Sequence, residues 1–310
     1  MTVADSSPLK VAFVGQGVYF RYCSLAMPAE GLEPTFVDFR AGAPPDILLA
    51  ELSTLDPDVV VMFRPEIIPP GLFGSLRAVT VGYLTEPLPR KRSVRHRDLD
   101  ARLWALRQVD PGNFDRIVSF DPLIASSAGR VLEVWRSLPI PVDDALFMDV
   151  HERQQPPRLL FLGRPTEHRE ALLAPIKRGH QIVHIGHGLL GAQLLRFLEC
   201  ADVQLNLHNH PYPTFENRVC FALAAGHLVI SEPLSPDHGL QAGRDFLEAA
   251  GADAFLALVN ELERDPTAYQ DVQHAGREQA EQFRASRVYP PLIRDALRDV
   301  AEHGSPRQRR

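Results

Sequence analysis

The sequence contains little cysteine, and its cysteines are far apart. Cys23, Cys200 and Cys220 are the three cysteines of the 310-residue chain, and no two of them have the CxxC spacing. Neither a disulfide framework nor a thiolate metal site is therefore expected. The pattern fits a protein of a reducing compartment.

Long hydrophobic runs are also missing. No stretch of about 18 apolar residues occurs, so a transmembrane segment is not expected. The N-terminus MTVADSSPLKVAFVG has neither a basic region nor an apolar region long enough for a secretory signal. We therefore predict a cytoplasmic protein.

The sequence also has no excess of positive charge. The formal net charge is −6, from 33 basic and 39 acidic residues. Nucleic-acid binding needs a clustered surplus of cations, so nucleic acid is not an expected partner. Lys10, Lys91 and Lys177 are the only lysines. A bound phosphate would thus be held by arginine, whose planar fork suits phosphate oxygens.

What the sequence does contain is the composition of an ordinary globular protein, with 45% apolar and 23% charged residues. A chain of 310 residues exceeds what one hydrophobic core usually supports, so two domains of roughly 150 residues each are expected.

The first half of the chain alternates short apolar runs with helical patterns. Strand patterns occur at 9–15, 34–39, 58–63, 78–84 and 116–120, and helical patterns occur around 45–54, 69–76 and 99–108. This βαβ alternation predicts a mainly parallel sheet in an N-terminal domain, residues 1–140.

A second alternation follows a proline-rich and charged linker at 136–157. Its strand patterns lie at 158–163, 181–186, 202–208 and 227–231, with helical patterns at 167–178, 189–200 and 215–225. The fold class is therefore α/β, with two Rossmann-like doubly wound domains, the second at 156–285. Beyond residue 251 the pattern is helical, with an expected break at 289–291, and the tail 303–310 is expected to be disordered.

Polar clusters follow the strands, at the edge where ligands bind in parallel α/β sheets. In the second half, Gly163 permits close approach of a ligand to the backbone. Arg164 and Arg169 flank the start of the next helix, whose free N–H groups favour an anion such as a diphosphate. The alternative is that Gly163 ends a strand and the arginines are solvated. In the first half, Gly15, Gly17, Arg64 and Arg90 form the corresponding rim, and two such rims imply a cleft between the domains.

The segment GHGLLG, residues 186–191, formally matches the dinucleotide-binding fingerprint. No acidic residue ends a strand about 20 residues later, so a nicotinamide or flavin cofactor is not expected. His187 and His208 belong to the only histidine-dense region. No carboxylate or thiolate completes a zinc site there, so ligand contact or packing is the prediction and no metal is expected.

The start of the predicted helix at 215–225 is densely polar. Thr214, Glu216, Asn217 and Arg218 stand together there. Thr214 and Glu216 suffice for an N-terminal cap, which is the plain structural interpretation. Because Asn217 and Arg218 exceed what a cap requires, we favour a binding site.

The same segment carries a family resemblance. Ala222, Ala224 and Gly226 in ALAAGHLVI end a small-residue helix just before a strand. This segment resembles the donor site of glycosyltransferases of the GT-B architecture, which have two facing Rossmann-like domains. Arg218 through Gly226 most resembles the compact spore-maturation-type (CgeB-like) glycosyltransferases. The resemblance implies a nucleotide-diphosphate sugar as donor in the second domain, and a C-terminal helix, 286–302, that returns to the first.

The sequence departs from the retaining members of that architecture. Their Glu-x7-Glu pair falls on Pro213 and Phe221, so it is absent. Glu216 is the nearest acidic substitute and could accept both hydroxyls of a ribose, with the Thr214 hydroxyl capping the helix and Arg218 facing the phosphates. The DLD segment, 98–100, matches a metal motif of another glycosyltransferase architecture but precedes a helix in an arginine-rich stretch. Metal-independent transfer is therefore expected.

Transfer to an acceptor hydroxyl requires a base, for which Glu86 is the candidate because it follows a strand of the first domain. The plain alternative for Glu86 is a turn residue before Pro87. Arg64 and Arg90 could hold an anionic acceptor or the donor phosphate, and the plain alternative is that they are solvated loop arginines. The acceptor class stays open between a small molecule, a glycan and a protein. Two other functions also stay open: a non-catalytic two-lobed nucleotide- or sugar-binding protein, and a sugar-nucleotide epimerase.

Overall fold

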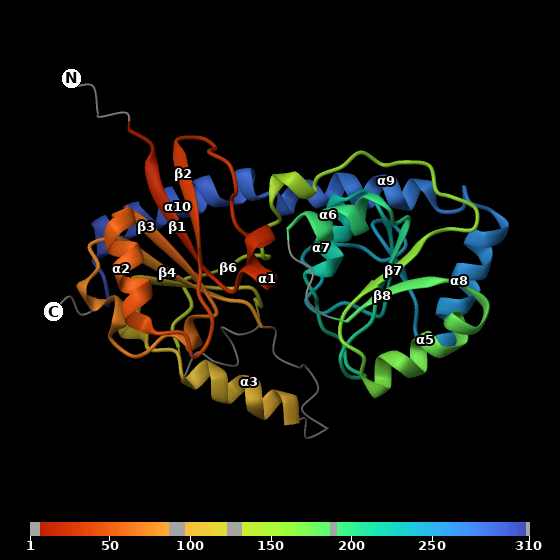
Figure 1. The fold of residues 1–310 in the computed structure, drawn as a ribbon, viewed down its shortest axis with the longest axis horizontal. Coiled ribbons are helices and arrows are strands. Elements are labelled where there is room, and N and C mark those ends of the chain that lie inside the picture. The colour runs from red at the N-terminus through yellow and green to blue at the C-terminus, as the bar shows by residue number, and fades with distance from the viewer. Residues whose placement is uncertain (1–6, 87–96, 123–131, 187–190, 308–310) are drawn as a thin grey trace. The chain divides into compact units, whose positions relative to one another are not determined.

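The computed structural model describes residues 7–86, 97–122, 132–186 and 191–307. Arg90 and His187, two of the predicted site residues, lie outside these ranges. The described chain divides into two compact units (Figure 1). Residues up to 144 together with residues 284–307 form the first unit, and residues 145–283 form the second.

The first unit contains a parallel sheet in the order β2-β1-β3-β4-β5-β6. Its strands are β1 (Leu9–Gly15), β2 (Leu32–Asp38), β3 (Val59–Phe63), β4 (Val79–Leu84), β5 (Arg116–Ser119) and β6 (Arg136–Ser137). Every residue of β3 and β4 is buried, as in central parallel strands that are covered on both faces. The five strands predicted for this half coincide with β1 to β5 to within two residues at each end.

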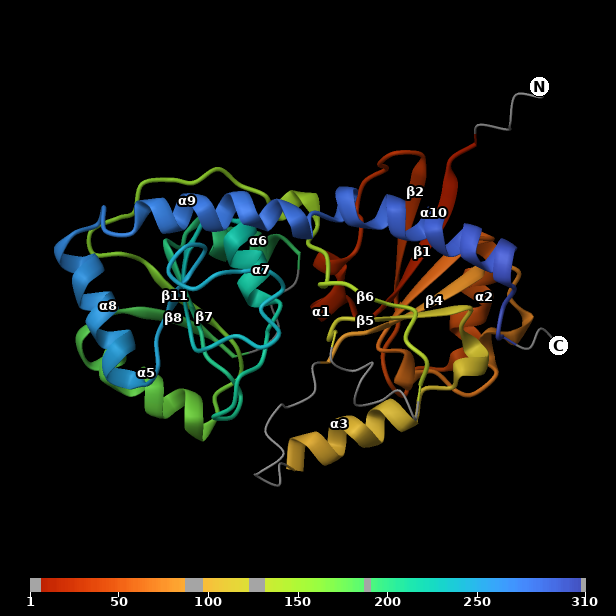
Figure 2. The same ribbon diagram turned by 180° about the vertical axis from the view of Figure 1, so that it is seen from behind.

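Helices cover both faces of this sheet. They are α1 (Gly17–Phe20), α2 (Pro45–Leu55), α3 (Arg97–Arg107) and α10 (Ala285–His303). In α2, Leu48 and Leu52 are one turn apart, so they point into the same core, where both are almost fully buried. α10 crosses the face turned away from the viewer in Figure 1 and is seen in front in Figure 2.

The helix predicted around 69–76 is not an α-helix. Two short 3-10 turns, Pro65–Ile67 and Leu72–Ser75, occupy this region. Pro69 and Pro70 lack the N–H groups that an α-helix needs, and Gly71 adopts a φ of 72°, which an α-helix does not allow.

The predicted break at 289–291 is also wrong, because α10 continues through Pro290 and Pro291. Tertiary packing explains the difference. The Tyr289 ring meets Phe13 edge-on at 4.5 Å, and its hydroxyl donates to the Cys23 carbonyl oxygen in the core. This burial stabilises a helix that proline alone would interrupt.

The chain after α10 remains packed on the first unit as far as it is described. Arg307 is buried, and its guanidinium donates to the Phe73 and Ala78 carbonyl oxygens at 3.0 Å each. It also lies 3.6 Å from the buried Asp115 carboxylate. Residues 304–307 thus differ from the disordered tail that the polar sequence predicted, because contacts distant in sequence hold them.

The second unit contains a parallel sheet in the order β11-β10-β9-β7-β8. Its strands are β7 (Leu159–Leu162), β8 (Ile182–Ile185), β9 (Val203–Asn206), β10 (Leu228–Ser231) and β11 (Leu247–Glu248). Its helices are α5 (Glu167–Gly179), α6 (Ala192–Glu199), α7 (Arg218–Ala224), α8 (Ala252–Arg264) and α9 (Gln270–Gln279). α5 and α8 share one hydrophobic core with the sheet, and α7 and α9 lie on its other face.

The turn from α7 to β10 explains the small residues that end this helix. Ala222 and Ala224 are fully buried, and the Ala224 carbonyl oxygen accepts the Met148 N–H at 3.0 Å. Gly226 has a φ of 77°, and a Cβ there would lie 3.1 Å from the Asp149 carbonyl oxygen. Only glycine fits where the incoming chain crosses so closely.

Both sheets have the same strand topology, and both units are Rossmann-like. The first strand of each unit pairs with the second strand on one side and the third on the other. The strand order therefore reverses between β1 and β3 in the first unit and between β7 and β9 in the second. Such a switch point is where ligands bind in open parallel sheets. No helix within the described ranges is both long and apolar enough to cross a membrane.

Candidate functional site

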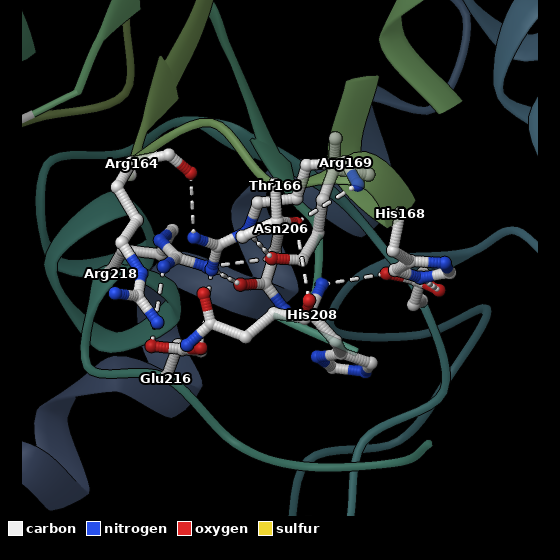
Figure 3. A network of polar contacts seen from close by, with 12 residues as sticks. Arg164, Thr166, His168, Arg169, Asn206, His208, Glu216 and Arg218 are labelled. Atoms are coloured by element: carbon white, nitrogen blue, oxygen red, sulfur yellow. Dashed lines mark hydrogen bonds and ion pairs between the residues drawn. The ribbon is translucent and has the colours of Figure 1, made fainter. Parts of the chain in front are cut away.

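An arginine cluster surrounds the switch point of the second unit (Figure 3). Arg169 lies in the first turn of α5, which follows β7, and Arg218 is the first residue of α7, which follows β9. Glu216 lies just before α7. The structure therefore brings together three residues that the sequence assigned to the donor site.

Arg169 is almost completely enclosed, with 2% of its side chain exposed. Its Nε donates to the Leu207 carbonyl oxygen at 2.9 Å, and its Nη1 donates to the Arg164 carbonyl oxygen at 3.1 Å. Its Nη2 lies 3.3 Å from Glu216 Oε1. Arg169 thus joins the loops after β7 and β9 and holds one oxygen of Glu216.

Arg218 makes the complementary contacts. Its Nη1 donates to Asn206 Oδ1 at 2.9 Å and to the Leu207 carbonyl oxygen at 3.1 Å. Its Nη2 lies 3.2 Å from Glu216 Oε2. The two arginines therefore clamp the carboxylate of Glu216, one on each oxygen, while its side chain remains 25% exposed.

An aromatic ring and a glycine make room for this pair of like charges. The Arg169 and Arg218 guanidinium carbons lie 5.4 Å and 5.6 Å from the centre of the buried Phe161 ring. A Cβ at Gly163 would lie 3.1 Å from Arg169 Nη1 and 3.2 Å from Arg218 Nη2. Gly163 thus leaves the two guanidinium groups the space that a larger residue would take from them.

The burial of the two guanidinium groups has an electrostatic cost. Burial, and secondarily the charge of Arg218, lowers the pKa of Arg169 to about 10. Burial also lowers the pKa of Arg218, while the nearby Glu216 carboxylate acts in the opposite direction. Both groups remain cations at neutral pH, so the clamp keeps its charge.

Arg164 differs from the other two arginines because it is exposed. It stands between Gly163 and the N-terminus of α5, where Thr166 caps the helix by accepting the Arg169 N–H at 3.2 Å. The Thr166 hydroxyl also donates to the Asn209 carbonyl oxygen at 3.1 Å. The rim of the site thus offers one exposed cation beside a helix N-terminus.

Thr214 does not cap α7, contrary to the sequence interpretation. The cap position of α7 is Asn217, which makes no side-chain capping bond. Thr214 is buried, and its backbone pairs with Leu234 and accepts the Ser235 N–H at 3.2 Å. It therefore fixes the loop that carries Glu216 against the chain that follows β10.

Glu232, which follows β10, is a site residue that the sequence interpretation missed. Its Oε1 lies 2.8 Å from His168 Nε2, and its Oε2 accepts the His208 N–H at 2.6 Å. The His208 ring is buried, its Nε2 pairs with the Pro233 carbonyl oxygen at 2.9 Å, and burial lowers its pKa. The position of Glu232 at a strand end was a usable signal.

The first unit has its own rim at the ends of β1, β3 and β4. The Gly17 N–H donates to Asp38 Oδ1 at 2.7 Å. Arg64 has a φ of 58°, and its Nε lies 2.8 Å from Glu66 Oε1. Glu86 pairs with Arg102 at 3.5 Å and keeps 53% of its side chain exposed.

No group of three or more potential metal ligands occurs in the part of the chain that the structure describes. No protein-family model and no curated protein sequence matches the chain.

Several solved structures of glycosyltransferases resemble this chain over nearly its whole length. HepE of Anabaena, solved with UDP-glucose, gives a TM-score of 0.62 at 10% identity over 94% of this chain and 100% of HepE. A glycosyltransferase of Rickettsia africae gives 0.60 at 10% identity over 94% and 99% of the two chains. AviGT4, a glycosyltransferase of avilamycin A biosynthesis, gives 0.58 at 16% identity over 95% and 98%.

The chain has the GT-B fold. This confirms the predicted fold class, with two Rossmann-like units built on parallel sheets. The narrower resemblance to CgeB-like proteins stays a prediction. At these identities the similarity concerns the fold, so a function must be argued from the GT-B site itself.

Proposed function

We propose that this protein is a glycosyltransferase whose second unit binds a nucleotide-diphosphate sugar. The observation that carries the proposal is the Glu216 carboxylate, clamped by Arg169 and Arg218 at the switch point between β7 and β9. Polar groups held this firmly at a ligand-binding edge are typical of a preorganised site. HepE, which shares the fold, was solved with UDP-glucose, and this supports the same ligand class here.

The clamped carboxylate suits a ribose. Glu216 Oε1 and Oε2 lie 3.3 Å and 3.2 Å from the Arg169 and Arg218 Nη2 atoms, and a carboxylate oxygen can accept more than one hydrogen bond. Two vicinal hydroxyl groups can donate to two such oxygens. Arg169, which is enclosed, therefore acts in this proposal as a positioning residue for Glu216.

The diphosphate would lie between Gly163 and the N-terminus of α5. Arg164 is exposed there, and the free N–H groups of the first turn favour negative charge. Arg218 adds a second cation on the other side of Gly163. Asn217, His187 and His208 stay as predicted donor contacts, and Thr214 supports the loop.

The acceptor is proposed to bind the first unit, at the rim that contains Gly15, Gly17 and Arg64, with Glu86 as the base; Arg90, which lies outside the described residues, stays a predicted acceptor contact. The exposure of Glu86 leaves its carboxylate accessible, although Arg102 lies beside it. We propose that transfer proceeds without a metal ion, with arginines and the α5 N-terminus meeting the charge of the departing diphosphate. We further propose that the protein is CgeB-like and cytoplasmic. Its acceptor is proposed to be a small molecule, a glycan or a protein.

A thermal-shift screen against nucleoside diphosphates tests the donor site. A ligand that binds the native state alone, at 100 times its dissociation constant, adds about 2.7 kcal/mol of stability. We expect one ribonucleoside diphosphate to raise the melting temperature and its 2′-deoxy analogue to raise it less. Glu216→Gln should remove this difference, because an amide offers one acceptor oxygen in place of two.

Three outcomes would contradict parts of the proposal. If no nucleoside diphosphate raises the melting temperature, the second unit is not a donor site. If one binds but the protein neither transfers nor hydrolyses the sugar of any matching nucleotide sugar, the protein belongs to the non-catalytic binding class. Sugar conversion without an acceptor would indicate an epimerase.

A further inference from the structure

A histidine–carboxylate pair lies at the edge of the arginine cluster (Figure 3). His168 Nε2 is 2.8 Å from Glu232 Oε1, and the His208 N–H fixes the second oxygen of Glu232 at 2.6 Å. An ionised carboxylate can only accept, so Nε2 carries a hydrogen and Nδ1 is left to take up a second proton. The His168 side chain is 19% exposed, so protons can reach it.

His168 also lies close to the expected diphosphate. It is the second residue of α5, in the first turn whose free N–H groups attract negative charge. Its neighbour Arg169 belongs to the clamp, and Glu232 lies within electrostatic range of both Arg169 and Arg218. Glu232 therefore contacts His168 and also interacts electrostatically with both arginines.

The charges of the site do not balance those of the proposed ligand. Arg164, Arg169 and Arg218 are opposed by Glu216 and Glu232, which leaves one net positive charge if His168 is neutral. A terminal phosphate group carries about −1.5 to −2 at pH 7, and the inner phosphate adds one more negative charge. The bound diphosphate would thus lack at least one compensating charge.

We propose that His168, oriented by Glu232, takes up a proton when a nucleoside diphosphate binds. The inference rests on the proposed function and adds a proton-linked positioning residue to it. During transfer the bond from the anomeric carbon to the diphosphate oxygen breaks, and its electron pair stays on that oxygen. The acceptor oxygen bonds to the same carbon and loses its proton to the base. The released diphosphate therefore has one more negative charge than the nucleotide sugar, and its binding should take up more protons.

Charged groups from two elements surround His168 in the described part of the site. Glu232 faces it from the end of β10, and Glu167, Arg169 and Glu170 are its charged neighbours on α5. His208, behind Glu232, is buried, and burial lowers its pKa, so its ring stays neutral. His184, on β8, lies 3.3 Å from Lys177 Nζ and 3.7 Å from Glu170 Oε1 through its Nδ1, so its ring is held by α5 side chains.

Isothermal titration calorimetry of the full chain with UDP and GDP measures this linkage. Titrations at pH 7.5 in buffers of different ionisation enthalpy give the number of protons taken up per bound nucleotide. We expect roughly half a proton or more for the wild type, and less for the matching nucleotide sugar. In His168→Gln the uptake should fall to roughly a fifth of the wild-type value or less, and Glu232→Gln should reduce it.

His180→Gln is the matched control. His180 ends the same helix, and its ring also contacts an amide and a carboxylate, Asn260 at 2.8 Å and Glu263 at 3.5 Å. This variant should keep the full proton uptake. If His168→Gln does not fold, His168→Asn serves in its place, with folding of both checked by circular dichroism.

Each outcome decides the proposal. Nucleotide binding without proton uptake in the wild type would overturn it and leave the proposed donor site intact. Equal uptake in wild type and His168→Gln, or loss of uptake in a His184→Gln protein instead, would also overturn it. If no nucleoside diphosphate binds at all, the proposed function fails and this inference fails with it.

Discussion

The two switch points of this molecule share a topology and differ in charge. In the second unit, Gly163 makes room for two buried arginines that hold the Glu216 carboxylate. In the first unit, a Cβ at Gly15 would meet Phe63 at 3.1 Å and Phe20 at 3.3 Å. The first glycine lies against an aromatic core, and the second lies against guanidinium groups.

The anion-binding capacity of the two rims differs in the same way. The Gly17 N–H already donates to the Asp38 carboxylate. In the loop after β1, a side chain of the same unit therefore takes the place that a bound anion would take. In the second unit Arg164 is exposed beside the α5 N-terminus. The side chains at equivalent strand ends, and not the sheet topology, therefore favour the second unit for the proposed diphosphate site.

The largest expected effect concerns the first unit. If Glu86 is the base, Glu86→Gln should lower turnover by about 10²–10⁴-fold and leave donor affinity unchanged, because the proposed donor contacts lie in the second unit. Steady-state rates and nucleotide titrations check this.

Glu66→Gln is the control that sharpens this test. Glu66 is another acid of the same rim, but 11% of its side chain is exposed and Arg64 lies 2.8 Å away. We expect near-normal turnover from this variant. A large loss with Glu66→Gln and a normal rate with Glu86→Gln would move the base to Glu66.

The second prediction concerns Arg218. Charge-assisted contacts contribute about 1.5–3 kcal/mol each, so Arg218→Ala should weaken nucleoside diphosphate binding roughly tenfold or more. Calorimetry measures the dissociation constant. Arg196→Ala, a change at an exposed position of α6, should leave it unchanged. Equal affinities of wild type and Arg218→Ala would remove Arg218 from the site.

The third prediction is a difference in acid sensitivity between the units. His227 is fully buried in the second unit, its Nε2 pairs with the Leu198 carbonyl oxygen, and burial lowers its pKa from 6.5 to about 4. Between these values the unfolded chain binds a proton that the folded unit does not, so stability falls as the pH drops. The loss should reach about 1.4 kcal/mol at pH 5.5 relative to pH 7.5.

Two optical signals separate the units in this experiment. Trp104 and Trp135 are the only tryptophans, and both belong to the first unit. The urea concentration at which circular dichroism reports unfolding of the second unit should be lower at pH 5.5 than at pH 7.5. The urea midpoint measured by tryptophan fluorescence should change less between the two pH values. His227→Gln should remove the pH-dependent part. An unchanged pH slope in that variant would show that another group is responsible.

The smallest effect is expected from Gly163→Ala. The added methyl group would press on Arg169, Arg218 and Phe161, and overpacking of this kind costs about 1 kcal/mol, or roughly fivefold in nucleotide affinity. Gly179→Ala, at the far end of α5, meets no atom within 4 Å and should bind normally. Equal affinity in both variants would show that the arginines need not keep their positions.

The elements that the sequence predicted well are those that local patterns define. β3, at 59–63, is a run of apolar residues, and α5 begins at a threonine cap and carries an apolar face. Two of the errors fell where distant contacts overrule local preference. α10 passes through Pro290 and Pro291 because Tyr289 is anchored in the core, and Arg307 is held by the carbonyl oxygens of Phe73 and Ala78.

Local patterns in the sequence were enough to predict the two alternating units and the places of Gly163, Arg164, Arg169, Glu216 and Arg218 after predicted strands, because the hydrophobic period is a local property of the chain. Which of these side chains contact one another is known only from the tertiary structure. Arg169 and Arg218 meet Glu216 because parallel strands bring the ends of β7 and β9 to one edge. Glu232 reaches His168 across 64 residues for the same reason. Partnerships of this kind depend on distances between segments far apart in the chain, which local patterns do not contain.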